Sequence, residues 1–142
     1  MSKTKYVVTT LIVLILALGF VGCSKKQYIH FDGYYSNEKQ LNSVAMFIQF
    51  YADGTVTAAL PITVQHVIQV SKNQLDKDNH KECTIRGKYT LKGNTIKYTL
   101  VDNNGSVDFD GEFQENKLIL KAHSNINGSD SVNTFDFYKW VH

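Results

Sequence analysis

Three closely spaced turn signals in the second half of the chain constrain its fold more than any other feature. The segments Lys92-Gly93-Asn94-Thr95, Asn103-Asn104-Gly105-Ser106 and Gln114-Glu115-Asn116-Lys117 are typical of two-residue hairpin loops. Between them apolar and polar residues alternate, as in strands that bury one face. The pattern predicts four consecutive antiparallel strands, because each loop sets the register of the two strands that it joins.

One face of these four strands is predicted to be apolar. We take the central loop residues to be Gly93-Asn94, Asn104-Gly105 and Glu115-Asn116. The inward rows are then Leu91, Ile96, Phe113 and Leu118; Tyr89, Tyr98, Gly111 and Leu120; and Gly87, Leu100, Phe109 and Ala122. In this register Tyr98 covers Gly111.

The opposite face of the same strands is polar. Lys97 is predicted to lie opposite Glu112, and Asp110 opposite Lys121. Such cross-strand pairs contribute about 0.2–1 kcal/mol each. Since Asp108, Asp110 and Glu112 alternate along one segment, we expect them on a solvated outer face rather than in a metal site.

A short pattern recurs in three predicted strands, with an apolar residue, a glycine and an aromatic residue at alternate positions. The three copies are Phe31-Asp32-Gly33-Tyr34-Tyr35, Ile85-Arg86-Gly87-Lys88-Tyr89 and Phe109-Asp110-Gly111-Glu112-Phe113. Glycine inside a strand lets the sheet coil sharply or lets another side chain lie across it. The recurrence therefore predicts a strongly curved sheet.

Val44–Ala52 is predicted to be a strand with bulky apolar residues on both faces. Met46, Ile48 and Phe50 alternate on one face, and Phe47 and Tyr51 lie on the other. One set can line a core. The other must pack against a helix, a partner or a closed-over loop.

The remaining segments complete an all-β chain. Asp53-Gly54 marks a turn into a strand from Thr55. Ile62–Val70 is β-branched and follows a proline, which favours a strand, although residues 62–75 also fit helical spacing. Lys72–Lys81 is predicted to be a polar loop, and Val132–Trp140 the last strand, with Phe135 and Phe137 inward.

The strands add up to a closed sheet. Counting Thr55–Val70 as one strand bent at Pro61 gives about eight strands, which suits a small barrel. The expected fold is an antiparallel up-and-down meander that closes into a barrel.

A barrel that opens with Asp32-Gly33-Tyr34-Tyr35 resembles the lipocalin-like proteins over about residues 30–140. Their first strand carries Gly-x-Trp, whereas Tyr35 stands at the aromatic position here. The resemblance implies a small apolar ligand held in the cup, or action through the rim. In this chain the cup would be walled by Tyr89, Tyr98, Leu100 and Phe109.

The first 22 residues have the pattern of a secretory signal. Lys3 and Lys5 precede the apolar run Tyr6–Val21, which is shorter than the ~20 residues of a comfortable membrane span. A single membrane-spanning anchor is the alternative. Phe20-Val21-Gly22-Cys23-Ser24 then resembles the lipobox of bacterial lipoproteins, with Phe20 where leucine is usual.

The lipobox resemblance implies where the protein resides. Residues 1–22 would be cleaved, Cys23 would carry lipid, residues 23–29 would form a tether, and residues 30–142 would form one domain. Because Ser24 rather than Asp follows the cysteine, a Gram-negative host would sort the protein to the periplasmic face of the outer membrane.

Charge and motifs narrow the class of function. Cleavage would remove two lysines from 15 Lys and Arg, leaving 13 against 13 Asp and Glu, so neither nucleic acid nor another acidic partner is indicated. No nucleophile motif or phosphate-binding glycine loop is present. Among the histidines, His66 falls on the apolar face of its predicted strand, which suggests a core or rim position.

A metal or cofactor is not expected. Asp78, His80 and Cys83 are of ligand type, but they provide too few good ligands for structural zinc. With Cys23 lipidated, Cys83 would be unpaired, and a buried thiol is the simplest explanation.

The sequence therefore predicts a non-catalytic, lipid-anchored binding protein of the bacterial envelope. Its ligand would be a small apolar molecule. The alternative is a protein-interaction module, such as a periplasmic inhibitor, immunity protein or assembly factor.

Overall fold

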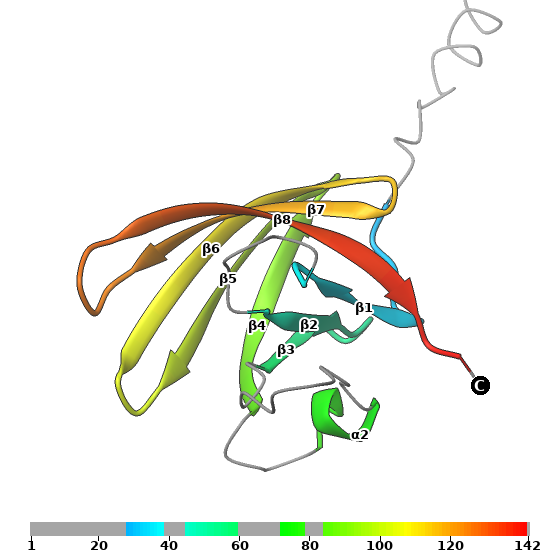
Figure 1. Cartoon of the computed structure of the whole chain (residues 1–142), viewed down its shortest axis with the longest axis horizontal. Helices are drawn as coiled ribbons and strands as arrows, with labels where there is room; N and C mark the ends of the chain where they lie inside the picture. Colours follow the sequence, from blue (N-terminus) through cyan, green and yellow to red (C-terminus); the bar gives the residue numbers. More distant parts are fainter. Residues whose placement is uncertain (1–27, 39–44, 60–71, 79–83, 142) are drawn as a thin grey trace, which may run out of the picture.

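The computed structural model describes residues 28–38, 45–59, 72–78 and 84–141 (Figure 1). Within these residues the strands are β1 (Gly33–Ser36), β2 (Phe47–Phe50), β3 (Thr55–Ala59), β4 (Thr84–Lys92), β5 (Thr95–Asp102), β6 (Gly105–Gln114), β7 (Lys117–Ser124) and β8 (Asp130–Lys139). Each strand pairs antiparallel with the next, and β8 pairs with β1, which closes the barrel. The predicted eight-stranded up-and-down meander is confirmed.

The barrel has two unlike ends. The β5–β6 and β7–β8 turns lie at one end, which we call the hairpin end. The β2–β3, β4–β5 and β6–β7 turns lie at the other, the terminal end, together with the first and last described residues. Because β1 to β3 have four or five residues and β4 to β8 have eight to ten, the long hairpins extend past the short strands (Figure 1).

Aromatic and aliphatic side chains fill the interior of the barrel. Phe50 lies at the centre, and its ring contacts rings from β1, β4, β5 and β6. Phe135 on β8 is buried, and Phe137 packs against the same core, as predicted. At the terminal end Ile29 also belongs to this core.

A second apolar cluster lies outside the sheet. The short helix α2 (Lys72–Leu75) packs over β2 and β3, where Leu75 and Phe47 are fully buried. The hydroxyls of Tyr51 and Thr57 each donate a 2.6 Å hydrogen bond to the carbonyl oxygen of Leu75. A helix therefore covers the second apolar face of β2, which was one of the predicted alternatives, and the prediction of a loop over Lys72–Leu75 is wrong.

The boundaries in the first half also differ from those predicted. Within the described part of the predicted strand Val44–Ala52, paired strand extends over Phe47–Phe50, and β3 is described from Thr55 to Ala59. The predictions for residues 62–70, including His66, lie outside the described residues.

Two of the three predicted hairpin registers are confirmed, and the third is shifted by two residues. Leu91 pairs with Ile96 and Phe113 with Leu118, as expected. In the β5–β6 hairpin, however, Asp102 pairs with Gly105, so the loop residues are Asn103 and Asn104.

The side chain of Asp102 accounts for this shift. Its carboxylate oxygen Oδ1 accepts hydrogen bonds from the backbone N–H groups of Asn104 and Gly105, at 2.7 and 3.1 Å. An Asp at the first turn position commonly stabilises a turn in this way. Because side chains alternate with a period of two, the same residues still face inward after the shift.

The shift changes which residues meet across β5 and β6. Tyr98 pairs with Phe109 rather than with Gly111, and Lys97 pairs with Asp110 rather than with Glu112. The predicted pairing of Asp110 with Lys121 across β6 and β7 is correct.

The recurrent glycines lie at close approaches, as the sequence pattern indicated. A Cβ atom at Gly33, Gly87 or Gly111 would clash with a carbonyl oxygen of a neighbouring strand. At Gly111 the atoms in the way belong to Ile119 and Leu120, so the prediction that Tyr98 covers this glycine is wrong.

Gly111→Val is expected to lower the free energy of unfolding by about 1–3 kcal/mol, through overpacking. A new Cβ would lie 2.5 Å from the carbonyl oxygen of Ile119 and would overlap Leu120. Urea denaturation followed by circular dichroism measures the loss.

Gly93→Asn in the β4–β5 turn is the matched control. A Cβ atom at position 93 would have no other atom within 4 Å. The φ angle of Gly93 is +62°, which Asn tolerates. We expect a change within about 0.5 kcal/mol. Equal losses in the two variants would contradict the close packing at Gly111.

Candidate functional site

The residues predicted to wall a cup come together inside the barrel. Tyr89 projects from β4, Tyr98 and Leu100 from β5, and Phe109 from β6. Tyr98, Leu100 and Phe109 are only 5%, 4% and 8% exposed, and Tyr89 is half-buried. The grouping expected from the sequence is therefore present, but as part of a packed core.

Their rings contact one another. Tyr98 and Phe109 stack with ring centroids 4.7 Å apart and planes inclined by 13°. Phe50 meets Tyr98 and Tyr89 edge-on, at centroid distances of 5.8 and 5.4 Å. These are ordinary separations for packed aromatic pairs. The rings thus occupy the space between β2 and β4 to β6 themselves.

The interior tyrosines differ in the hydrogen bonds that their hydroxyl groups form. The Tyr89 hydroxyl donates to the carbonyl oxygen of Tyr51 at 2.7 Å, and the Tyr35 hydroxyl accepts from the backbone N–H of His30 at 3.1 Å. The Tyr98 hydroxyl is buried and has no hydrogen-bond partner among the described residues. An unpaired buried hydroxyl costs about 1–3 kcal/mol, so Tyr98 is an exception to be explained.

Burial keeps these hydroxyls neutral. Loss of solvent raises the pKa of Tyr98 well above its usual value and raises the pKa of Tyr35 to about 12. The polar side chains buried in the described part of the chain are those of Ser36, Asn37, Gln49 and Thr57, none of which is charged. The barrel interior therefore offers no countercharge to an ion.

A hollow of about 620 Å³ lies on the outer face of the sheet, over β5 to β8 from the middle of these strands toward the hairpin end. Its lining includes Lys97, Thr99, Asp108, Asp110, His123 and Val132. These residues alternate with inward ones such as Tyr98 and Phe109, and Lys97, Asp110 and His123 are exposed. The alternation identified the outer face from the sequence, but not its concave shape.

Charges in the hollow are paired with each other. Lys97 Nζ lies 2.5 Å from Asp110 Oδ2, and His123 Nδ1 lies 2.8 Å from Asp130 Oδ1. Exposed pairs of this kind typically contribute about 0–1 kcal/mol. The hollow therefore presents a mixed and nearly balanced set of charges.

Asp108 is also satisfied within the hollow. It accepts hydrogen bonds from the hydroxyl of Thr99 at 2.6 Å and from the side-chain amide of Asn125 at 2.8 Å. These hydrogen bonds lower the pKa of the Asp108 carboxyl. Asp108 stays ionised at neutral pH and is held in place, which suits a recognition surface better than proton transfer.

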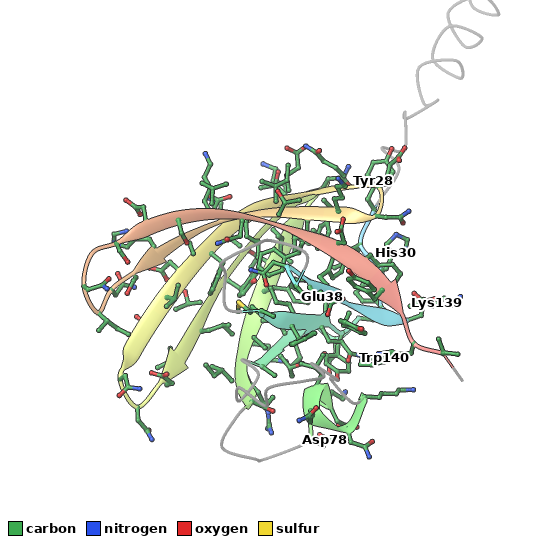
Figure 2. The ribbon with its side chains drawn as sticks, viewed as in Figure 1. Tyr28, His30, Glu38, Asp78, Lys139 and Trp140 are labelled. Carbon is green, nitrogen blue, oxygen red and sulfur yellow. The ribbon has the colours of Figure 1, made fainter. Side chains whose placement is uncertain are left out.

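The other predicted site residues lie elsewhere or outside the described residues. Asp78 follows α2 and is exposed (Figure 2), whereas Cys23, His80 and Cys83 are outside the described ranges. Within those ranges no group of three or more His, Cys, Asp or Glu side chains could hold a metal ion.

Comparison of the chain with family models, with curated proteins and with solved structures gave no match. Among the residues that the structure describes, no helix is long and apolar enough to cross a membrane.

Tyr98→Phe is expected to leave the free energy of unfolding unchanged or to raise it by up to about 1 kcal/mol, because it removes a buried hydroxyl that lacks a partner. Tyr89→Phe is the matched control. It deletes the hydrogen bond to Tyr51 and should lower the free energy of unfolding by about 1 kcal/mol. Urea denaturation measures both, and an equal loss in the two variants would mean that Tyr98 has a partner in solution.

Proposed function

We propose that this protein is a non-catalytic binding protein of the bacterial cell envelope, attached to the membrane through lipid on Cys23. The support for the anchor is the basic start, the short apolar run and the lipobox-like Phe20-Val21-Gly22-Cys23. A doubly acylated cysteine would hold the domain at the membrane stably, since a single chain gives only marginal binding. In a Gram-negative host the location would be the periplasmic face of the outer membrane.

The binding partner that we favour is another envelope protein. One observation carries this choice: the rings expected to wall a cup pack on one another, whereas a hollow lies open on the outer face. The hollow combines the exposed apolar Val132 with Lys97, Asp110, His123 and Asp130, which are groups that the polar rim of a non-obligate interface can hold. Of the two functions that the sequence suggested, the interaction module fits this geometry better.

A catalytic role has little support. Enzyme sites gather titratable groups whose pKa values are shifted by burial and by specific neighbours. The acidic groups of the hollow are exposed and are ion-paired or hydrogen-bonded to Lys97, Thr99 and His123. We therefore propose no reaction, metal or cofactor for this surface.

A small apolar ligand inside the barrel is the second candidate. The unpartnered hydroxyl of Tyr98 favours it, because a ligand oxygen would supply the missing acceptor. Since no charged side chain is buried among the described residues, such a ligand would be uncharged. It would require Tyr98 and Phe109 to separate.

Lipidation is tested with a fatty-acid probe in a bacterial host. The wild-type protein should incorporate the probe and Cys23→Ser should not, because the Cys23 sulfur would be the acceptor of the lipid. Cys83→Ser is the matched control and should be labelled like the wild type. Label retained by Cys23→Ser would refute the lipid anchor.

The kind of partner is tested by native mass spectrometry of the protein purified from the envelope of its own host. The favoured proposal predicts a retained protein that is lost in Val132→Glu, because Val132 is 64% exposed in the hollow. Val101→Glu is the matched control. Val101 is a 62% exposed valine near the hairpin end that does not line the hollow, and its variant should retain the partner.

Other outcomes would count against this choice. A partner retained equally by both valine variants would place the interface away from the hollow. A small neutral molecule retained by the wild type and lost in Tyr98→Phe would support the interior site instead.

A further inference from the structure

The described chain begins and ends at the same end of the barrel. The backbone N–H of Tyr28 donates to Asn94 Oδ1 in the β4–β5 turn at 3.3 Å. The backbone N–H of Trp140 donates to the carbonyl oxygen of Asp32 at 3.1 Å, and Lys139 pairs with the Asp32 carboxylate. Figure 2 shows Tyr28, His30, Lys139 and Trp140 on one side of the molecule, away from the long hairpins.

The terminal end also exposes apolar side chains. Phe31 is 42% exposed and Val141 is 98% exposed, although both are large hydrophobic residues. Trp140 is half-buried and packs against the second cluster, and its ring centroid lies 4.6 Å from that of Tyr34. Aromatic rings with a neighbouring lysine, here Lys139, are the combination that favours the interface between lipid and water.

The hairpin end exposes apolar residues as well, namely Val101, Ile126 and Val132. Exposure alone therefore does not decide which end faces a membrane. The short tether favours the terminal end, because Tyr28 lies there. Four residues separate Cys23 from Tyr28, and a chain of this length reaches at most about 17 Å when fully extended.

We propose that the terminal end of the barrel rests on the lipid headgroup surface, with Phe31, Trp140 and Val141 at the interface. The hairpin end and the outer hollow then point away from the membrane, where they are open to a partner. This inference rests on the proposed lipidation of Cys23. It goes beyond the anchor, because a short tether alone would allow the domain to tumble above the surface.

The single tryptophan of the chain, Trp140, is a built-in reporter for this orientation. The full lipidated protein is incorporated into vesicles of phosphatidylethanolamine and phosphatidylglycerol, part of whose acyl chains are brominated close to the headgroup. Bromine quenches tryptophan at short range, so Trp140 should lose most of its emission. Flotation of the vesicles shows independently whether the protein is attached.

Two double variants move the reporter. Trp140→Phe with Phe31→Trp keeps it at the terminal end, and its emission should be quenched and shifted to the blue. Trp140→Phe with Val101→Trp moves it to an exposed position near the hairpin end, where emission should be unaffected by brominated lipid. Melting curves of both variants verify that the barrel is folded.

The two proposals fail in different ways. If the wild type floats with the vesicles but Trp140 and the Phe31→Trp reporter are not quenched, the orientation is wrong and the anchor stands. Stronger quenching of the Val101→Trp reporter would reverse the orientation. If the wild type does not float, the lipid anchor fails, and this inference fails with it.

Discussion

The packing of aromatic rings around Phe50 is the constraint on which the rest of the barrel depends. Its ring centroid lies 5.4–5.8 Å from those of Tyr35, Tyr89, Tyr98 and Phe113, which come from four other strands. Such pairs add about 0.5–1.5 kcal/mol each beyond the burial of their surface. They link strands that are distant in sequence, so the barrel closes around a filled interior. Because the interior is filled, we propose the outer face as the place where a partner binds.

The outer face combines balanced charge with an ordered set of hydrogen bonds. Lys97 pairs with Asp110, and Asp108 is held by Thr99 and Asn125. Exposed ion pairs contribute little to folding, but charge complementarity fixes the register of a partner and excludes wrong ones. On the other side of the barrel, α2 covers the outward face of β2 and removes Phe47 from solvent. The two outer surfaces therefore differ: one is closed by the chain itself, and the other is open.

The hairpin pattern was sufficient to predict most of the sheet. Two loops were located correctly: in the β4–β5 loop Gly93 adopts the positive φ that such hairpin turns need, and in the β6–β7 loop Glu115 adopts it. The β5–β6 loop was misplaced by one residue, which shifts the pairing of the two strands by two, because Asp102 holds the turn through its side chain. Since the pairing shifted by an even number of residues, the predicted inward face survived. The loop predicted over Lys72–Leu75 failed because one turn of helix carries too little periodicity to be recognised.

The sequence by itself determined the alternation of the strands, the number of strands and the side of each strand that is buried, because these follow from local turn chemistry and from the period of two. It also grouped Tyr89, Tyr98, Leu100 and Phe109 on one inner surface. Whether that surface encloses a cup or a packed core was decided by tertiary structure alone. Phe50 comes from a distant strand, and only closure of the barrel brings its ring against Tyr89 and Tyr98. The outer hollow likewise depends on tertiary structure, since residues of β5, β6, β7 and β8 line it together.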